Sequence, residues 1–300
     1  MYSIDKLYHA VAQKGNVCVG LDAAIEYLPQ AALQNGTNET EAMLDYNKAI
    51  VDATLDVAAC YKVQIACYEA LGVAGLELYS KTVRYIRERG ALAIADIKRG
   101  DIADTAARYA KAHFSGDFEA DFVTLNPYMG MDSLEPWLIE AEKRGKGAFV
   151  LLRTSNKGFR DFEGRQLKEG GFVYDAVGEK LNALAAQHAG QCGFGIFGAV
   201  VGAEAKSAAE CEEAKALRAT YGNLFFLIPG YGAQGGGAEE ASLLLHADKN
   251  GGVVNASRSI LTAWRHGADD AHPTLLGAAA AARTAALEMR DALRRQSAGQ

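Results

Sequence analysis

Short runs of apolar residues recur along the whole chain, and longer stretches with helical spacing of apolar positions separate them. Most of the short runs are apolar at successive positions, with little alternation. This pattern is typical of strands that are buried on both faces of a parallel sheet. The pattern predicts eight strands, over 16–21, 60–66, 92–97, 122–126, 148–153, 195–201, 224–228 and 252–255.

The intervals between these runs carry amphipathic patterns and helix end signals. The stretch 76–89 ends in basic residues followed by Gly90, which indicates a helix C-terminus. The stretch 41–58 opens near Asn38, a residue type that caps helices, with Glu41 three positions later as a capping-box partner. Further helices are expected over 4–12, 132–144, 173–188, 206–220, 239–246 and 278–295.

Strand and helix patterns alternate from end to end, with no low-complexity linker and no internal repeat. Eight such units predict an α/β fold, a (β/α)₈ TIM barrel that occupies residues 1–300 as a single domain. The segment 4–12 would close the bottom of the barrel, and 278–295 would be the eighth outer helix. A doubly wound open sheet is the alternative, but no GxGxxG motif follows the first run.

Composition and charge narrow the function classes. Apolar residues make up 49% of the chain and charged residues 23%, which is enough apolar surface for a packed core. The net charge of −6 disfavours broad nucleic-acid binding, which needs a basic face, but permits a small anion held by local cations. No apolar run approaches the roughly 18 residues that cross a bilayer, and the N-terminus lacks a signal-peptide pattern.

The five cysteines are odd in number and form no CxxC motif, which indicates reduced thiols. Together with the preceding points, this predicts a cytoplasmic protein that binds neither nucleic acid nor membranes. The six histidines form no HxH or HExxH motif, so we expect no histidine metal site.

Charged residues gather where the barrel would carry its chemistry, at the C-terminal ends of the strands. Asp96 and Lys98 end the third strand and lie two apart, so both side chains point into the lumen. Lys62 lies on the second strand. Asp101 follows the third strand and opens the next expected helix, where it is the candidate for the N-terminal cap. Buried charges must be paired, so these four groups form either a structural ion-pair network or a site. Charge at a barrel mouth favours the site.

The loop after the seventh strand indicates anion binding. It begins at Pro229 and has five glycines between Gly230 and Gly237. In TIM barrels phosphate often binds in the loops after strands seven and eight, and bare glycine backbone can offer N–H groups to it. Arg258 follows the eighth strand, and its guanidinium suits phosphate oxygens. The alternative, a plain turn and a surface arginine, leaves the length of the loop unexplained.

Seven segments of the chain resemble those of orotidine 5′-phosphate decarboxylases, and most closely the longer bacterial form, and they appear in the same order as in that family. The run ADIKRGDI with an upstream lysine at position 62 is the specific part of the resemblance. The segments are GLD at 20–22, YKVQIACYE at 61–69, ADIKRGDIADTA at 95–106, TLNPYMG at 124–130, RTSNKG at 153–158, IPGYGAQGGG at 228–237 and NASRSI at 255–260.

The resemblance implies a decarboxylation of orotidine 5′-monophosphate to UMP and CO₂ in de novo pyrimidine biosynthesis, with no cofactor and no metal. Lys98 would protonate C6 of the pyrimidine, and Asp96 would face the departing carboxylate. Lys62 and Asp22 would hold the ribose hydroxyls. Asp101 would reach into the active site of the neighbouring subunit, next to its Lys62, so the resemblance implies a homodimer with shared sites.

The resemblance also assigns the remaining substrate contacts. Ser155 would bond the pyrimidine amide, and Gln234 and Arg258 would hold the phosphate. Ile102 and Thr105 would line the shared edge. The other substrate-binding positions implied are Asn126, Pro229, Gly230, Gly232 and Gly235.

Two other functions stay open. A metal-dependent sugar-phosphate decarboxylase or aldolase on the same barrel would share the D-x-K-x-x-D run, but it would need carboxylate ligands where Lys62 stands. A catalytically silent protein that binds nucleotide phosphates would keep the glycine loop and Arg258 without needing the charged array. The charged array favours the decarboxylase. An ammonium such as that of Lys98, aimed at C6, would stabilise the electron pair that CO₂ leaves behind and then donate its proton.

Overall fold

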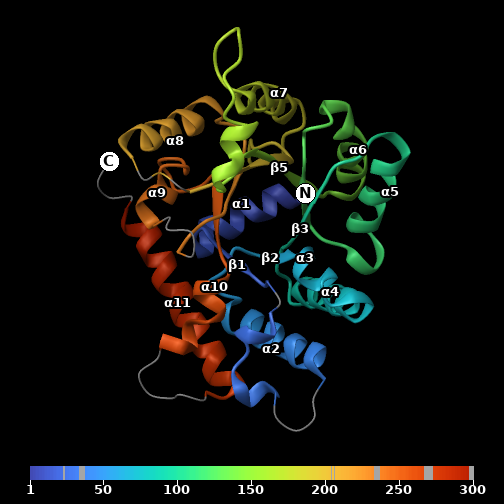
Figure 1. The fold of residues 1–300 in the computed structure, drawn as a ribbon, viewed down its shortest axis with the longest axis vertical. Coiled ribbons are helices and arrows are strands. Elements are labelled where there is room, and N and C mark those ends of the chain that lie inside the picture. Colours follow the sequence, from blue (N-terminus) through green and yellow to red (C-terminus); the bar gives the residue numbers. More distant parts are fainter. Residues whose placement is uncertain are drawn as a thin grey trace.

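The computed structural model describes residues 1–22, 24–33, 38–203, 205, 207–232, 237–266 and 273–296. Eight parallel strands pair in chain order and close into a barrel, because β1 also pairs with β8 (Figure 1). The predicted TIM barrel is therefore confirmed, and the open sheet is excluded. The strands are β1 (Val17–Gly20), β2 (Cys60–Gln64), β3 (Ala93–Arg99), β4 (Phe122–Leu125), β5 (Gly147–Arg153), β6 (Phe197–Val201), β7 (Phe226–Ile228) and β8 (Gly252–Ala256).

The strands are buried along nearly their whole length, which explains why their sequences are continuously apolar. Inside the barrel, Phe122 and Phe149 fill the lower lumen with ring centroids 5.2 Å apart. The neighbouring strands leave room for them: a Cβ on Gly147 would lie 2.7 Å from the Phe122 ring, and one on Gly198 would lie 3.0 Å from the Phe149 ring. The lumen below the C-terminal ends is thus a packed core.

Helices surround the barrel at the positions that the sequence predicts, with shifted ends (Figure 1). The helix expected over 41–58 ends at Thr54, because Val57 and Ala58 donate to the Thr54 carbonyl and Ala59 donates to Val17. The main helices are α1 (Ser3–Lys14), α2 (Glu39–Thr54), α4 (Gly72–Glu88), α5 (Ala103–Phe114), α6 (Glu135–Arg144), α7 (Val173–Gln187), α8 (Ala208–Thr220) and α11 (Leu275–Arg295). Three short helices are α3 (Ile65–Glu69), α9 (Ala238–Ser242) and α10 (Arg258–Leu261).

Helix α1 closes the bottom of the barrel, as predicted. The Ser3 N–H donates to the Gly145 carbonyl at 2.7 Å, and Asp5 accepts the Cys192 N–H at 2.9 Å. Both partners precede strands, so α1 covers N-terminal strand ends and leaves the opposite end open. Helix α11 packs on α2 beside β1 as the eighth outer helix, with Arg283 ion-paired to Asp56.

Among the described residues, no helix has the length and apolar character needed to span a membrane. All five cysteines lie in described segments and are free thiols, as expected from their number and spacing.

Candidate active site

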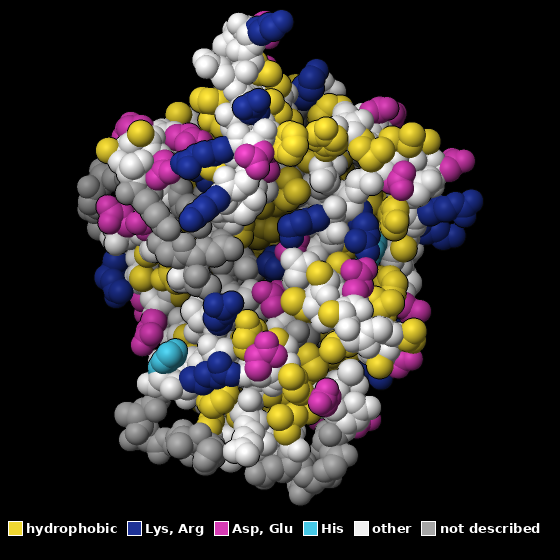
Figure 2. Space-filling view, viewed as in Figure 1, with side chains coloured by type: hydrophobic (Ala, Val, Ile, Leu, Met, Phe, Trp, Pro, Cys, Tyr) yellow, Lys and Arg dark blue, Asp and Glu magenta, His cyan; other side chains and the backbone are white. Residues whose placement is uncertain are grey.

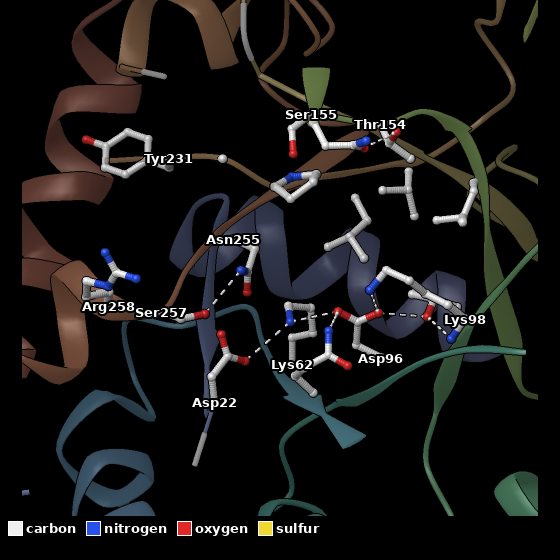
Figure 3. A pocket seen from close by; sticks show the side chains of 18 of the residues that line it. Asp22, Lys62, Asp96, Lys98, Thr154, Ser155, Tyr231, Asn255, Ser257 and Arg258 are labelled. Atoms are coloured by element: carbon white, nitrogen blue, oxygen red, sulfur yellow. Dashed lines mark hydrogen bonds and ion pairs between the residues drawn. The ribbon is translucent and has the colours of Figure 1, made fainter. Parts of the chain in front are cut away.

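A cavity of about 590 Å³ opens at the C-terminal end of the barrel, seen as a hollow near the centre of Figure 2. Four of the predicted charged residues meet along its floor (Figure 3). The Lys62 Nζ lies 2.9 Å from Asp96 Oδ2 and 3.5 Å from Asp22 Oδ1. The Lys98 Nζ lies 2.5 Å from Asp96 Oδ1. The order Asp22, Lys62, Asp96, Lys98 thus alternates negative and positive charges across the floor.

The electrostatics of the array keep its central groups charged. Burial alone would raise the pKa of Asp96, but the ammonium groups of Lys62 and Lys98 outweigh burial and hold that pKa well below its usual range. Burial alone would lower the pKa of Lys62, but the carboxylates of Asp96 and Asp22 outweigh burial and raise it. The Asp96 carboxylate is therefore ionised at neutral pH.

Two further residues, neither of them predicted from the sequence, donate hydrogen bonds to Asp96. Gln64 donates from Nε2 to Asp96 Oδ2 at 2.8 Å, and Thr124 donates from Oγ1 to Asp96 Oδ1 at 2.8 Å. Gln64 lies two positions after Lys62 on β2, so strand alternation was a signal that could have found it. With Lys62 and Lys98, these groups give each Asp96 oxygen two donors.

The opposite side of the cavity carries the predicted anion-binding residues. Arg258 lies across the cavity from Lys98 in Figure 3 and is exposed, with its Nε 3.4 Å from the Tyr27 hydroxyl. Pro229 and Gly230 also line the cavity, and Gly230 has φ +103°, a conformation that favours glycine. Ser257, Asn255 and Tyr231 complete this side.

Ser155 lies on the cavity wall, on the loop that follows β5. Its backbone packs directly on Gly202, where a Cβ would come within 2.8 Å of the Ser155 Cα. The preceding residue, Thr154, donates its backbone N–H to the Glu163 carboxylate at 2.7 Å and its hydroxyl to Asn156 at 2.7 Å. Close packing and these hydrogen bonds fix where Ser155 meets the cavity.

The family model described as "Orotidine 5′-phosphate decarboxylase / HUMPS family" matches residues 15–268. The chain belongs to this family. An orotidine 5′-phosphate decarboxylase from Clostridium perfringens (strain SM101 / Type A) is 52% identical over 290 residues, which are 97% of each chain. One from Clostridium novyi (strain NT) is 53% identical over 262 residues, which are 87% of this chain and 89% of the other. The solved structure of Leishmania donovani OMP decarboxylase is 28% identical, covers 100% of both chains and has a TM-score of 0.76.

The orotidine 5′-phosphate decarboxylase / HUMPS family match contains every predicted site residue, but the structure does not bring all of them to this cavity. Asp101, Ile102, Thr105 and Asn126 do not line it, and neither does Gly232. Asn126 Oδ1 instead accepts the Tyr128 N–H at 2.9 Å. Gln234 and Gly235 lie outside the described residues.

The expectation that Asp101 caps the following helix is wrong. Helix α5 begins at Ala103 with Ile102 in the capping position, and no side chain caps it. The Asp101 Oδ1 accepts the N–H of the adjacent Ile102 at 2.8 Å, so its carboxylate does not reach the first turn.

The described residues contain no group of three or more His, Cys, Asp or Glu side chains arranged to hold a metal ion. In the cavity the carboxylates of Asp22 and Asp96 have the Lys62 ammonium between them. A divalent cation placed there would meet a positive charge, so this donor set does not suit magnesium.

Proposed function

We propose that this chain decarboxylates orotidine 5′-monophosphate to UMP and CO₂ in de novo pyrimidine biosynthesis, without a metal or cofactor, and that residues 1–300 act as one cytoplasmic domain. The observation that carries the proposal is the alternating array Asp22, Lys62, Asp96 and Lys98 on the cavity floor, with Arg258 on the opposite side. A cavity of about 590 Å³ is within the usual range for small-molecule sites.

The chemistry assigned to Lys98 follows from where charge develops. When the bond between C6 and the carboxyl carbon breaks, the electron pair stays on C6 and CO₂ departs. The Lys98 ammonium stabilises that pair and gives its proton to C6, which leaves a neutral amine that solvent reprotonates. The Asp96 carboxylate stays ionised beside it and holds the Lys98 Nζ at 2.5 Å. Repulsion between Asp96 and the substrate carboxylate is relieved as CO₂ leaves.

The family resemblance assigns the remaining contacts. Asp22 and Lys62 bind the ribose hydroxyls, and Ser155 binds the pyrimidine amide. The phosphate lies at Arg258 and at the glycine loop, to which Gln234 and Gly235 belong. Phosphate binding away from C6 supplies binding energy that orients the reacting atoms.

A homodimer with shared sites is part of the proposal. Asp101, Ile102 and Thr105 lie at the rim of the barrel but outside the cavity of their own chain. Large apolar side chains are exposed nearby: Ile102 is 49% exposed, Tyr128 83% and Met129 48%. Burying such side chains against a second copy would be favourable. The family resemblance implies that Asp101 then reaches the Lys62 of the neighbouring subunit.

The test is to follow the loss of orotidylate absorbance with purified protein in buffer containing EDTA and to identify the product. The proposal expects unchanged turnover with EDTA and UMP as the product. Activity that EDTA abolishes would indicate a metal-dependent enzyme. Tight binding of UMP without any turnover of orotidylate would indicate a silent nucleotide-binding protein.

A further inference from the structure

Thr124 on β4 contacts two members of the charged array through a single atom. Its Oγ1 accepts a hydrogen bond from the backbone N–H of Lys98 at 2.9 Å and donates one to Asp96 Oδ1 at 2.8 Å. A hydroxyl has one donor and two acceptor sites, so one oxygen can make both bonds. Thr124 is 1% exposed, so its side chain is buried at the cavity floor.

The pairing of β3 with β4 explains why this hydroxyl is needed. Ala95 pairs with Val123, and the ladder resumes only where Arg99 pairs with Leu125. Asp96, Ile97 and Lys98 therefore lie opposite the single residue Thr124. Such an irregularity disrupts the ordinary ladder hydrogen bonds and leaves backbone groups that need other partners. Within this segment, the Thr124 hydroxyl oxygen accepts the hydrogen bond from the Lys98 N–H.

The backbone of Lys98 is held in an unfavourable conformation. Its φ of +45° lies in the left-handed region, which a residue with a side chain adopts only when its surroundings hold it there. The Lys98 side chain is 45% exposed, so its own packing contributes little to that restraint. The polar contacts with Thr124 and Asp96 supply it, and they bring Lys98 Nζ to Asp96 Oδ1.

We propose that Thr124 is a positioning residue for the decarboxylation, which acts by holding the irregular β3 segment so that Asp96 and Lys98 face the same point in the cavity. The inference rests on the proposed function, since it assigns Thr124 its effect through the proton donor. It also makes a structural claim of its own, that the Thr124 hydroxyl holds the Lys98 N–H.

The experiment compares Thr124→Val, which lacks the hydroxyl, with Thr124→Ser, which keeps it. Thr124→Val should lower kcat on the order of 10- to 100-fold, the factor expected from losing one hydrogen bond to a charged group, with KM changed much less. Thr124→Ser should keep most of the activity. Thr124→Ala serves as a second hydroxyl-free variant if Thr124→Val folds poorly.

The matched control is Thr54→Val on α2. Thr54 is also fully buried, and its hydroxyl also makes two hydrogen bonds, to the Ile50 carbonyl and the Tyr61 hydroxyl. It lies outside the cavity, so this variant should lose thermal stability but retain kcat. A buried hydroxyl that matters only for stability would behave in this way at position 124 as well.

The second readout is hydrogen exchange at the Lys98 amide, which does not depend on activity. Exchange should be slow in the wild type and in Thr124→Ser, and faster in Thr124→Val. Equal losses of kcat in the Ser and Val variants, or wild-type kcat in a folded hydroxyl-free variant, would overturn the inference. If the wild type itself does not decarboxylate orotidylate, the proposed function fails, and unchanged Lys98 exchange in Thr124→Val would separately refute the structural claim.

Discussion

Exchange of subunits between two inactive variants tests whether Asp101 acts in the neighbouring site. Lys98→Ala removes the proton donor of one cavity, and Asp101→Ala removes a group that does not line the cavity of its own chain. If Asp101 acts across the interface, a heterodimer has one site with both lesions and one site with neither. Each heterodimer therefore regains one working site.

The size of the recovery follows from the geometry. Random exchange of equal amounts makes about half of the dimers heterodimers, and half of the sites in those are intact. Activity should therefore rise from near zero to roughly a quarter of the wild-type value. The assay is loss of orotidylate absorbance, measured after exchange has been verified by native mass spectrometry.

A second pair of variants controls for recovery by any other route. Lys98→Ala and Lys62→Ala both damage the same cavity, because both ammonium groups contact Asp96 of the same chain. Their exchanged mixture should stay inactive, since every site keeps one lesion. If the mixture of Lys98→Ala with Asp101→Ala also stays inactive after verified exchange, Asp101 does not serve the neighbouring site.

Substitutions of Arg258, Gly202 and His113 test other parts of the structure. Arg258→Ala should weaken binding of UMP by roughly 10- to 100-fold but leave uridine binding unchanged, as calorimetry can measure; equal losses would make Arg258 structural. Gly202→Ala should displace Ser155 and lower kcat/KM, because the new Cβ would lie 2.8 Å from the Ser155 Cα. Gly222→Ala is the control: its Cβ would meet open space, so kcat/KM should change little. Burial, together with the charge of Arg99, lowers the pKa of His113 to about 4. Between pH 6.5 and pH 4 the unfolded state therefore binds a proton that the folded state does not. The free energy of unfolding should fall by about 3 kcal/mol across this range. Urea unfolding of His113→Phe should lack this pH dependence. If the free energy of unfolding of the variant falls with pH as steeply as that of the wild type, His113 is not its source.

The barrel could be predicted from sequence because its strands are buried on both faces. Continuous apolar runs such as that of β6 (Phe197–Val201) arise directly from that burial. Four of the floor residues could be predicted as well. Asp96 and Lys98 share a face through strand alternation, Lys62 lies on the neighbouring strand, and the family resemblance adds Asp22. The ends of the helices were predicted less accurately, because they depend on local hydrogen bonds such as those that the Thr54 carbonyl accepts.

The contacts of Thr124 could not be predicted, because they depend on the register between two strands. A regular ladder would place one residue of β3 opposite Thr124, whereas the irregular ladder places three there. The expected cap at Asp101 failed for a related reason. Its carboxylate bonds the next N–H along the chain, a local choice that residue type alone does not determine.

The role of Lys98 as proton donor is best tested with Lys98→Ala, with turnover and ligand binding measured on the same protein. Decarboxylation of orotidylate should fall by roughly 10³-fold or more, because both the proton and the charge at C6 are lost. UMP binding should largely survive, since Arg258 lies on the other side of the cavity. Turnover within about tenfold of the wild type in a folded Lys98→Ala variant would contradict the assignment.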